Sequence, residues 1–225
     1  MKMIFKLLAV AGLLPIAAFA QPVPEMGFVR IVNAVSPGTG HATFLIDGRS
    51  LFEGGYQLGQ TTGGYGVARG TRTIEVRKAG VVSGSTRVDL AEGETMTVIA
   101  YAERLPAVRQ EDKPRWTIKL LRLKQQDHER GFGLSIVPVT AADDAVVDVT
   151  MPGKGKTQKV HAGRLKITKV NLGRARDDVE IVSGGRNVAT VSLDARGNYV
   201  VILFDDAGGG IGAISFYDPK FVVAG

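Results

Sequence analysis

The 225-residue sequence contains no cysteine, one tryptophan and only three histidines. The absence of cysteine excludes disulfides, thiolate metal ligands and a thiol nucleophile, so the core alone must stabilise the fold. His41, His128 and His161 lie in unrelated contexts, and no spacing among them and nearby carboxylates indicates a metal or catalytic site. We therefore predict no catalytic residue, no cofactor and no metal centre, and we expect a protein that is not an enzyme.

Paired aspartates are the closest approach to a carboxylate site, at Asp143-Asp144, Asp177-Asp178 and Asp205-Asp206. Adjacent residues in a strand point to opposite faces, and aspartate is favoured in turns, so we interpret all three pairs as turn residues. The weak candidates for a calcium site are Asp205 and Asp206, which precede Gly208-Gly209-Gly210 without matching the EF-hand pattern.

Charge of one sign is also not in large excess. There are 28 basic and 22 acidic residues, a formal net charge of +6, and Lys2 and Lys6 contribute two of those positive charges. A mild excess spread along the chain does not require a nucleic-acid partner, and we expect none. The sequence Gly155-Lys156-Thr157 ends like a phosphate-binding loop but lacks the preceding glycine and the helix that this loop requires.

The first twenty residues predict a secretory signal peptide. Lys2 and Lys6 form a basic start, Leu7 to Ala18 is an apolar run, and Ala18-Phe19-Ala20 is a small-x-small cleavage site. The run is shorter than the about 20 apolar residues that span a membrane, and Pro15 interrupts it. We expect cleavage after Ala20, a mature chain without a membrane span, and a location in the periplasm or outside the cell.

Glycine, by contrast, is abundant, at 29 residues, and short runs rich in valine, isoleucine and threonine alternate with polar residues. Alternation at period two and frequent turns predict an all-β protein. The segment Trp116–Lys124 could form a short helix, but we predict a strand with a bulge near Leu120-Leu121. The other predicted strands include Phe28–Val35, His41–Ile46, Thr71–Arg77, Thr86–Leu90 and Thr95–Tyr101.

An internal repeat divides the chain after the signal peptide. Four segments recur in the same order at an offset of about 104 residues. If the loop after Phe204 is shorter than the predicted loop Pro106–Pro114, Ile211–Tyr217 is the counterpart of Trp116–Leu123. We therefore predict two tandem immunoglobulin-like β-sandwich domains of about seven strands each, at residues 26–126 and 131–225. The matched pairs are Gly27–Val32 with Gly131–Val137, Thr73–Val76 with Asp178–Val182, Val88–Gly93 with Val191–Gly197, and Thr97–Tyr101 with Val200–Phe204.

Two stretches are candidates for ligand binding. Two Gly-Gly-Tyr units lie between Gly54 and Gly66, and their tyrosines either form flat platforms for sugars or peptides or, in the interpretation we favour, pack on the core edge. Basic residues around the Trp116 strand either protect an edge strand or attract an acidic polysaccharide. The tentative ligand-binding residues are Tyr56, Tyr65, Arg115, Trp116 and Lys119.

The first domain resembles a known bacterial family. Phe28–Ala34, then Ser36-Pro37-Gly38, then Phe44–Gly48, is similar to the "VRVVNAS" and "VDVYVDG" strands of DUF4397-type domains. Gly70–Arg77 resembles the "AGTYTVEV" element of that family, and Glu92–Val98 resembles its "pGxxYTVV" element. Phe28–Ala34 also resembles the first strand of the periplasmic accessory (F) component of alginate O-acetylation, which shares the signal peptide and the tandem layout.

Both resemblances imply a non-catalytic exported protein. The leading hypothesis is a cell-envelope interaction or scaffold protein, most specifically an accessory factor for exopolysaccharide O-acetylation of the alginate type. Its expected partners are envelope proteins or an extracellular polysaccharide. The alternatives are a carbohydrate-binding or adhesive module and a hydrolase of envelope polymers.

Overall fold

The computed structural model describes residues 25–106, 115–126, 128, 131–153, 155–206 and 208–219, and the regular structure within them consists of β-strands. The predicted all-β class is therefore confirmed for these residues. The described part of the chain contains no helix long and apolar enough to cross a membrane. The predicted signal peptide lies outside the described residues, as do residues 107–114 and most of the stretch 127–130 between the two predicted domains.

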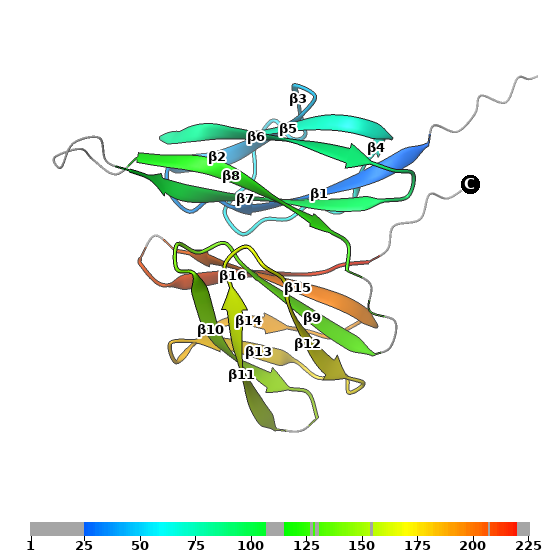
Figure 1. The fold of residues 1–225 in the computed structure, drawn as a ribbon, viewed down its shortest axis with the longest axis vertical. Helices are drawn as coiled ribbons and strands as arrows, with labels where there is room; N and C mark the ends of the chain where they lie inside the picture. Colours follow the sequence, from blue (N-terminus) through cyan, green and yellow to red (C-terminus); the bar gives the residue numbers. More distant parts are fainter. Residues whose placement is uncertain are drawn as a thin grey trace, which may run out of the picture.

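The first half of the chain forms one hydrogen-bonded sheet in the order β3-β2-β5-β6-β8-β7-β1-β4 (Figure 1). Side chains from both ends of this order share one apolar cluster, including Val29, Phe44 and Ile74, so the sheet folds over on itself around a core. The strands are β1 (Met26–Ala34), β2 (Thr39–Ile46), β3 (Arg49–Ser50), β4 (Tyr65–Ala68), β5 (Gly70–Ala79), β6 (Val81–Leu90), β7 (Thr95–Leu105) and β8 (Arg115–Lys124).

A single bridge between Val82 and Thr117 joins β6 to β8 and so connects the two layers of this half. Gly84 lies beside the bridge, and a Cβ atom built on it would meet the carbonyl oxygen of Ile118 at 2.2 Å. A residue without a side chain is therefore needed where β6 and β8 approach most closely.

The second half forms two four-stranded sheets, β11-β10-β13-β14 and β12-β9-β15-β16, that share one apolar core. Phe132, Val147, Ile181 and Val201 are fully or nearly fully buried there and come from both sheets. The strands are β9 (Phe132–Pro138), β10 (Asp144–Met151), β11 (Lys156–Gly163), β12 (Thr168–Gly173), β13 (Val179–Ser183), β14 (Arg186–Val191), β15 (Gly197–Asp205) and β16 (Ile211–Tyr217).

The strand pairing of the second half repeats that of the first. The first strand of each half pairs in parallel with the seventh, β1 with β7 and β9 with β15, and the seventh pairs antiparallel with the eighth. In the same way β2-β5-β6 corresponds to β10-β13-β14. The expected counterparts Trp116–Leu123 and Ile211–Tyr217 thus occupy equivalent closing strands, β8 and β16.

Three details of the sequence-based expectations are wrong. Each half of the described chain has eight strands rather than about seven. Strand β8 pairs with β7 in an uninterrupted register, so no bulge interrupts it near Leu120. The match of Phe28 with Phe132 is off by one residue. Phe28 lies on the same face of β1 as Val32, and this face packs between the two halves. Phe132, by contrast, packs in the core of the second half. A one-residue shift exchanges the two faces of a strand.

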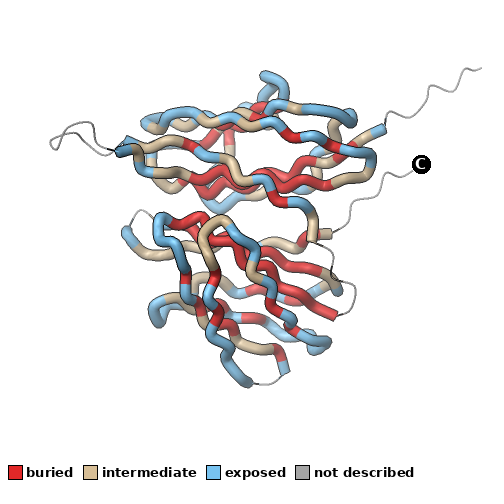
Figure 2. The backbone as a smooth tube through the Cα atoms, viewed as in Figure 1, coloured by how far each residue is buried: buried red, intermediate tan, exposed pale blue. Residues whose placement is uncertain are grey.

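A third apolar cluster joins the two halves. Val32, Ile99 and Tyr101 of the first half pack with Val200 and Ile202 of the second, and all five side chains are at most 6% exposed. Figure 2 shows the buried segments on the two facing layers. Because apolar burial is the main favourable contribution to folding and association, this junction holds the halves together in one arrangement.

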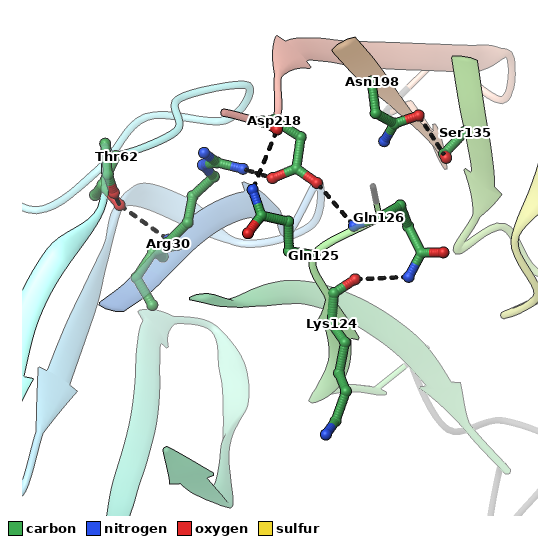
Figure 3. Close-up of polar contacts among 10 residues, drawn as sticks. Arg30, Thr62, Lys124, Gln125, Gln126, Ser135, Asn198 and Asp218 are labelled. Atoms are coloured by element: carbon green, nitrogen blue, oxygen red, sulfur yellow. Dashed lines mark hydrogen bonds and ion pairs between the residues drawn. The ribbon is translucent and has the colours of Figure 1, made fainter. Parts of the chain in front are cut away.

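An ion pair reinforces the junction at one end (Figure 3). Arg30 of β1 bonds to Asp218, and its guanidinium carbon lies 4.8 Å from the centre of the Phe216 ring. The second carboxylate oxygen of Asp218 accepts a bond from the backbone N–H of Gln126 at 3.2 Å. The residue that follows β16 is therefore fixed to both the first strand and the end of the first half.

Candidate functional site

A pocket of about 470 Å³ opens at the junction, where turns and strand ends of both halves meet. Its walls are mostly apolar and its rim carries two carboxylates. The first half contributes Ala34, Ser36, Pro37, Ala102 and Trp116, and the second half contributes Val139, Phe204, Asp205, Asp206 and Gly209.

A second pocket of about 330 Å³ adjoins the first, because Ala102 and Trp116 line both. We call the two pockets together the junction groove. Trp116, the one tryptophan of the sequence, lies where they meet. The second pocket is otherwise lined by Glu103, Arg104, Thr140, Ala141 and Arg164.

Local structure explains the position of Trp116. Strand β8 runs antiparallel to β7, which places Trp116 opposite Arg104 near the start of β8. The neighbouring β7 residue Ala102 is small, and Pro37 lies in the turn that ends β1, as the Ser36-Pro37-Gly38 sequence predicts. The indole is only partly buried. It therefore offers an aromatic surface to the groove.

The two carboxylates at the rim also build the local turns. Asp205 accepts a bond from the N–H of Ala141 at 2.7 Å, which links the two sides of the rim. Asp206 accepts bonds from the N–H groups of Gly208 and Gly210, at 2.8 and 2.9 Å, and from Arg186 at 3.0 Å. The bond from Gly210, and then the bond from Arg186, hold the pKa of Asp206 below its usual value.

These contacts bear on the weak calcium candidates. Asp205 accepts its bond from Ala141, 64 positions away, whereas Asp206 has the expected turn role, because it accepts bonds from the N–H groups of Gly208 and Gly210. Asp177 behaves in the same way, because it accepts bonds from the N–H groups of Gly153 and Asp178. Within the described residues, no group of three or more His, Asp or Glu side chains could hold a metal ion.

The far wall of the groove is tied across the junction. Arg164 bonds to the carboxylate of Glu103 and donates from Nε to the carbonyl oxygen of Thr140 at 2.7 Å. Burial, and next the nearby charge of Glu103, raises the pKa of the Tyr101 hydroxyl. The wall is therefore fixed by charged contacts between side chains of both halves.

The structure separates the five tentative ligand-binding residues. Tyr56 packs edge-on against Phe44, with ring centres 5.4 Å apart, and burial raises the pKa of its hydroxyl. Tyr65 is 49% exposed and lines a different pocket of about 460 Å³, with Arg72 and Leu51 among its neighbours. The lining of that pocket does not include Tyr56, although Tyr65 is close enough that its charge, after burial, contributes to the raised pKa of Tyr56.

The strand β8 candidates also divide. Arg115 and Lys119 are exposed and do not belong to the described lining of the junction groove, whereas Trp116 does. Sequence reasoning missed Pro37, Phe204 and Thr140 because they become neighbours only when the two halves pack. The sequence signal that pointed to this place was the group of basic residues around the Trp116 strand.

Comparisons with known proteins assign no family. No family model matches the sequence, and no curated protein matches it. A solved structure described as the Bacillus anthracis TIE protein aligns with 81% of this chain and 50% of that chain, at 11% identity and a TM-score of 0.25. The chain thus spans about half the length of that protein, and a likeness at this level indicates nothing about function.

Proposed function

We propose that this chain is a non-enzymatic exported protein of the cell envelope that acts as an interaction or scaffold protein. In this proposal residues 26–126 and 131–225 are two tandem immunoglobulin-like domains. One observation carries it: the two halves share an apolar cluster and a buried ion pair. Binding surfaces on the two halves therefore keep a fixed geometry, which lowers the ordering cost of holding a partner.

The more specific form of the proposal is an accessory role in exopolysaccharide O-acetylation of the alginate type. It rests on the resemblance of Phe28–Ala34 to the first strand of the accessory component of that machinery. In this chain Phe28–Ala34 pairs with β7, and its residues Val32 and Ala34 pack at the junction. The proposed partners are envelope proteins of that machinery or the polymer itself.

Export is tested first, because the rest of the proposal depends on it. Mass spectrometry and N-terminal sequencing of the protein from cell fractions should show a mature chain that begins at Gln21. Ala20→Arg should block this cleavage, because the site requires small residues. A full-length protein that stays in the cytoplasm would overturn the export proposal.

Partner capture tests the scaffold role. The tagged full chain, cross-linked in the intact envelope, should recover components of the acetylation machinery, and deletion of the gene should lower polymer acetylation. Asp218→Ala should reduce capture by loosening the junction, whereas Glu75→Gln, which changes an exposed ion pair within β5, should not. Unchanged acetylation together with no recovered component would overturn the specific role.

The non-enzymatic part of the proposal has its own test. The purified mature chain, incubated with envelope polymers, should leave their chain lengths and their acyl groups unchanged. Polymer cleavage that a single acidic substitution abolishes would identify a hydrolase and contradict this part.

A further inference from the structure

We propose that the junction groove binds a neutral, hydroxyl-rich glycan, with one sugar ring stacked on Trp116. The inference goes beyond the proposed function and rests on it in one respect: an exported protein meets such glycans. Because an alginate-type polymer consists of uronates, the groove is not the place where the polymer of that proposal would bind. It names a ligand class and a site for a chain whose interaction surfaces are otherwise unassigned.

The lining of the first pocket matches one face of a sugar ring. The partly exposed indole of Trp116 is accompanied by Ala34, Pro37, Ala102 and Phe204, which give this pocket a largely apolar surface. Small-molecule sites are typically lined by hydrophobic and aromatic side chains, with a few polar groups that fix the orientation of the ligand. The carbon-bound hydrogens of a sugar ring can pack on such a surface while its hydroxyls point to the rim.

The rim supplies acceptors for those hydroxyls. The bond from Ala141 uses one oxygen of Asp205, and an ionised carboxylate has about four acceptor sites, so Asp205 keeps capacity for a ligand. Hydroxyl groups donate to carboxylates in charge-assisted bonds, which are stronger than bonds between neutral groups. Asp206 remains ionised at neutral pH, because its contacts hold its pKa low.

The same carboxylates select against acidic sugars. A uronate ring on Trp116 would bring its own carboxylate to the rim formed by Asp205 and Asp206. Like charges placed together at a binding surface repel each other, and this repulsion is a common source of specificity. The groove chemistry therefore favours neutral sugar units over uronates at this position.

The adjoining pocket extends the site beyond one ring. Trp116 also lines the second pocket, together with Arg104 and Thr140, and Arg104 is exposed. A guanidinium donates hydrogen bonds, and a threonine hydroxyl both donates and accepts them. The groove thus offers polar groups in both pockets that Trp116 lines, which suits an oligosaccharide with Trp116 under an inner unit.

The strand order argues against an extended peptide as the ligand. Peptides that bind by strand addition need an unpaired sheet edge. The groove is lined from β1, β7, β8, β15 and the ends of their connections, and each of these four strands has a neighbour on both sides. Strand addition is therefore disfavoured, although β8 meets β6 at only the Val82–Thr117 bridge, and recognition through side chains fits this arrangement better.

The single tryptophan gives a direct assay. The mature full chain is titrated with neutral oligosaccharides and, separately, with uronate oligosaccharides, while fluorescence is excited at wavelengths that tyrosine does not absorb. We expect neutral oligosaccharides to change the emission of Trp116 and uronates to bind more weakly. A folded chain that binds no neutral oligosaccharide, or that binds uronates more tightly, would overturn the proposal.

Variants locate the binding, with calorimetry as the readout. Trp116→Ala should weaken binding by about tenfold or more, a ratio equivalent to 1.4 kcal/mol, and Asp205→Asn should also weaken it. Trp116→Phe, which keeps a ring, should lose less. Phe52→Ala is the matched control, because it removes an exposed aromatic that does not line the junction groove. Equal affinity for the native chain and Trp116→Ala would overturn the assignment.

The outcomes separate this inference from the proposed function. If Trp116→Ala fails to fold, as judged by thermal unfolding, Trp116→Phe and Asp205→Asn still decide the site. Failure of the capture experiment with intact glycan binding would reject the scaffold role and leave the groove assignment standing. Absence of glycan binding together with intact capture would reject the groove assignment and leave the scaffold role standing.

Discussion

Arg30 in β1 and Asp218 after β16 form a buried ion pair, although 188 positions separate them in the sequence. Their Nη1 and Oδ1 atoms lie 2.5 Å apart, and the two side chains are 3% and 2% exposed. The pair connects the start of the first half to the end of the second. It fixes their relative position because a charge this deeply buried is costly to leave unpaired.

Asp218→Ala should therefore destabilise the protein by about 3–5 kcal/mol, because it leaves the Arg30 guanidinium buried without its carboxylate. Urea unfolding, followed by tyrosine and tryptophan fluorescence, measures the change. The double variant Arg30→Met with Asp218→Leu should recover most of the loss, since well-packed apolar residues can replace a buried pair. If Asp218→Ala unfolds like the native chain, the pair does not hold the junction.

The apolar part of the junction gives a second prediction. Ile202→Ala should cost about 2–5 kcal/mol, because it removes a fully buried side chain and leaves a cavity between the halves. Small-angle scattering should also show a larger radius of gyration when the halves separate. Ile181→Ala, fully buried in the core of the second half, is the control: it should lower stability without changing the radius. Equal radii of gyration for the two variants would contradict the role of Ile202 in holding the two halves together.

Gly84→Ala tests the close approach of β6 and β8. The new Cβ atom would lie 2.2 Å from the Ile118 carbonyl oxygen, so the strands must move apart, at a cost of about 1–3 kcal/mol. Thermal unfolding is the measurement. Gly63→Ala is the matched control, because a Cβ atom there meets nothing within 4 Å. A native melting temperature for Gly84→Ala would show that the bridge does not constrain this half.

Much of the fold could be predicted because strand patterns are local. Alternation in Thr71–Arg77 gives β5, and the buried positions of that strand, Ile74 and Val76, recur as Val179 and Ile181 in β13. The internal repeat likewise gave the correspondence of β8 with β16. The one-residue mismatch of Phe28 with Phe132 arose because both faces of β1 are apolar. One face packs in the core of the first half, and the other packs against the second half.

The site was largely beyond prediction because it exists only between the halves. Pro37 and Phe204 are ordinary strand-end residues in the sequence, and only packing brings them to one pocket. The ion pair of Arg30 with Asp218 has no local signature, because arginine in an alternating strand normally indicates a solvent-facing position. Trp116 could be singled out by the basic residues around its strand, but its neighbours in the groove could not.

The carboxylate of Asp206 gives a prediction about pH. Its folded-state pKa lies below the ordinary value of 3.8, mainly because it accepts the Gly210 N–H bond and next because of Arg186. A depressed carboxylate pKa stabilises the fold fully above the unfolded pKa, and this contribution is lost as the pH falls through the folded-state value. Asp206→Asn should therefore lower the melting temperature near neutral pH, and the difference from the native chain should shrink below pH 3.8.

A carboxyl NMR titration measures the same effect directly and should give an Asp206 pKa below 3.8. Arg186→Met should raise that pKa only part of the way, because the N–H bonds from Gly208 and Gly210 remain. If the pKa returned fully to its ordinary value in Arg186→Met, the ion pair rather than the turn would control this carboxylate. If the melting difference of Asp206→Asn were constant across the acid range, the linkage between this group and stability would be absent.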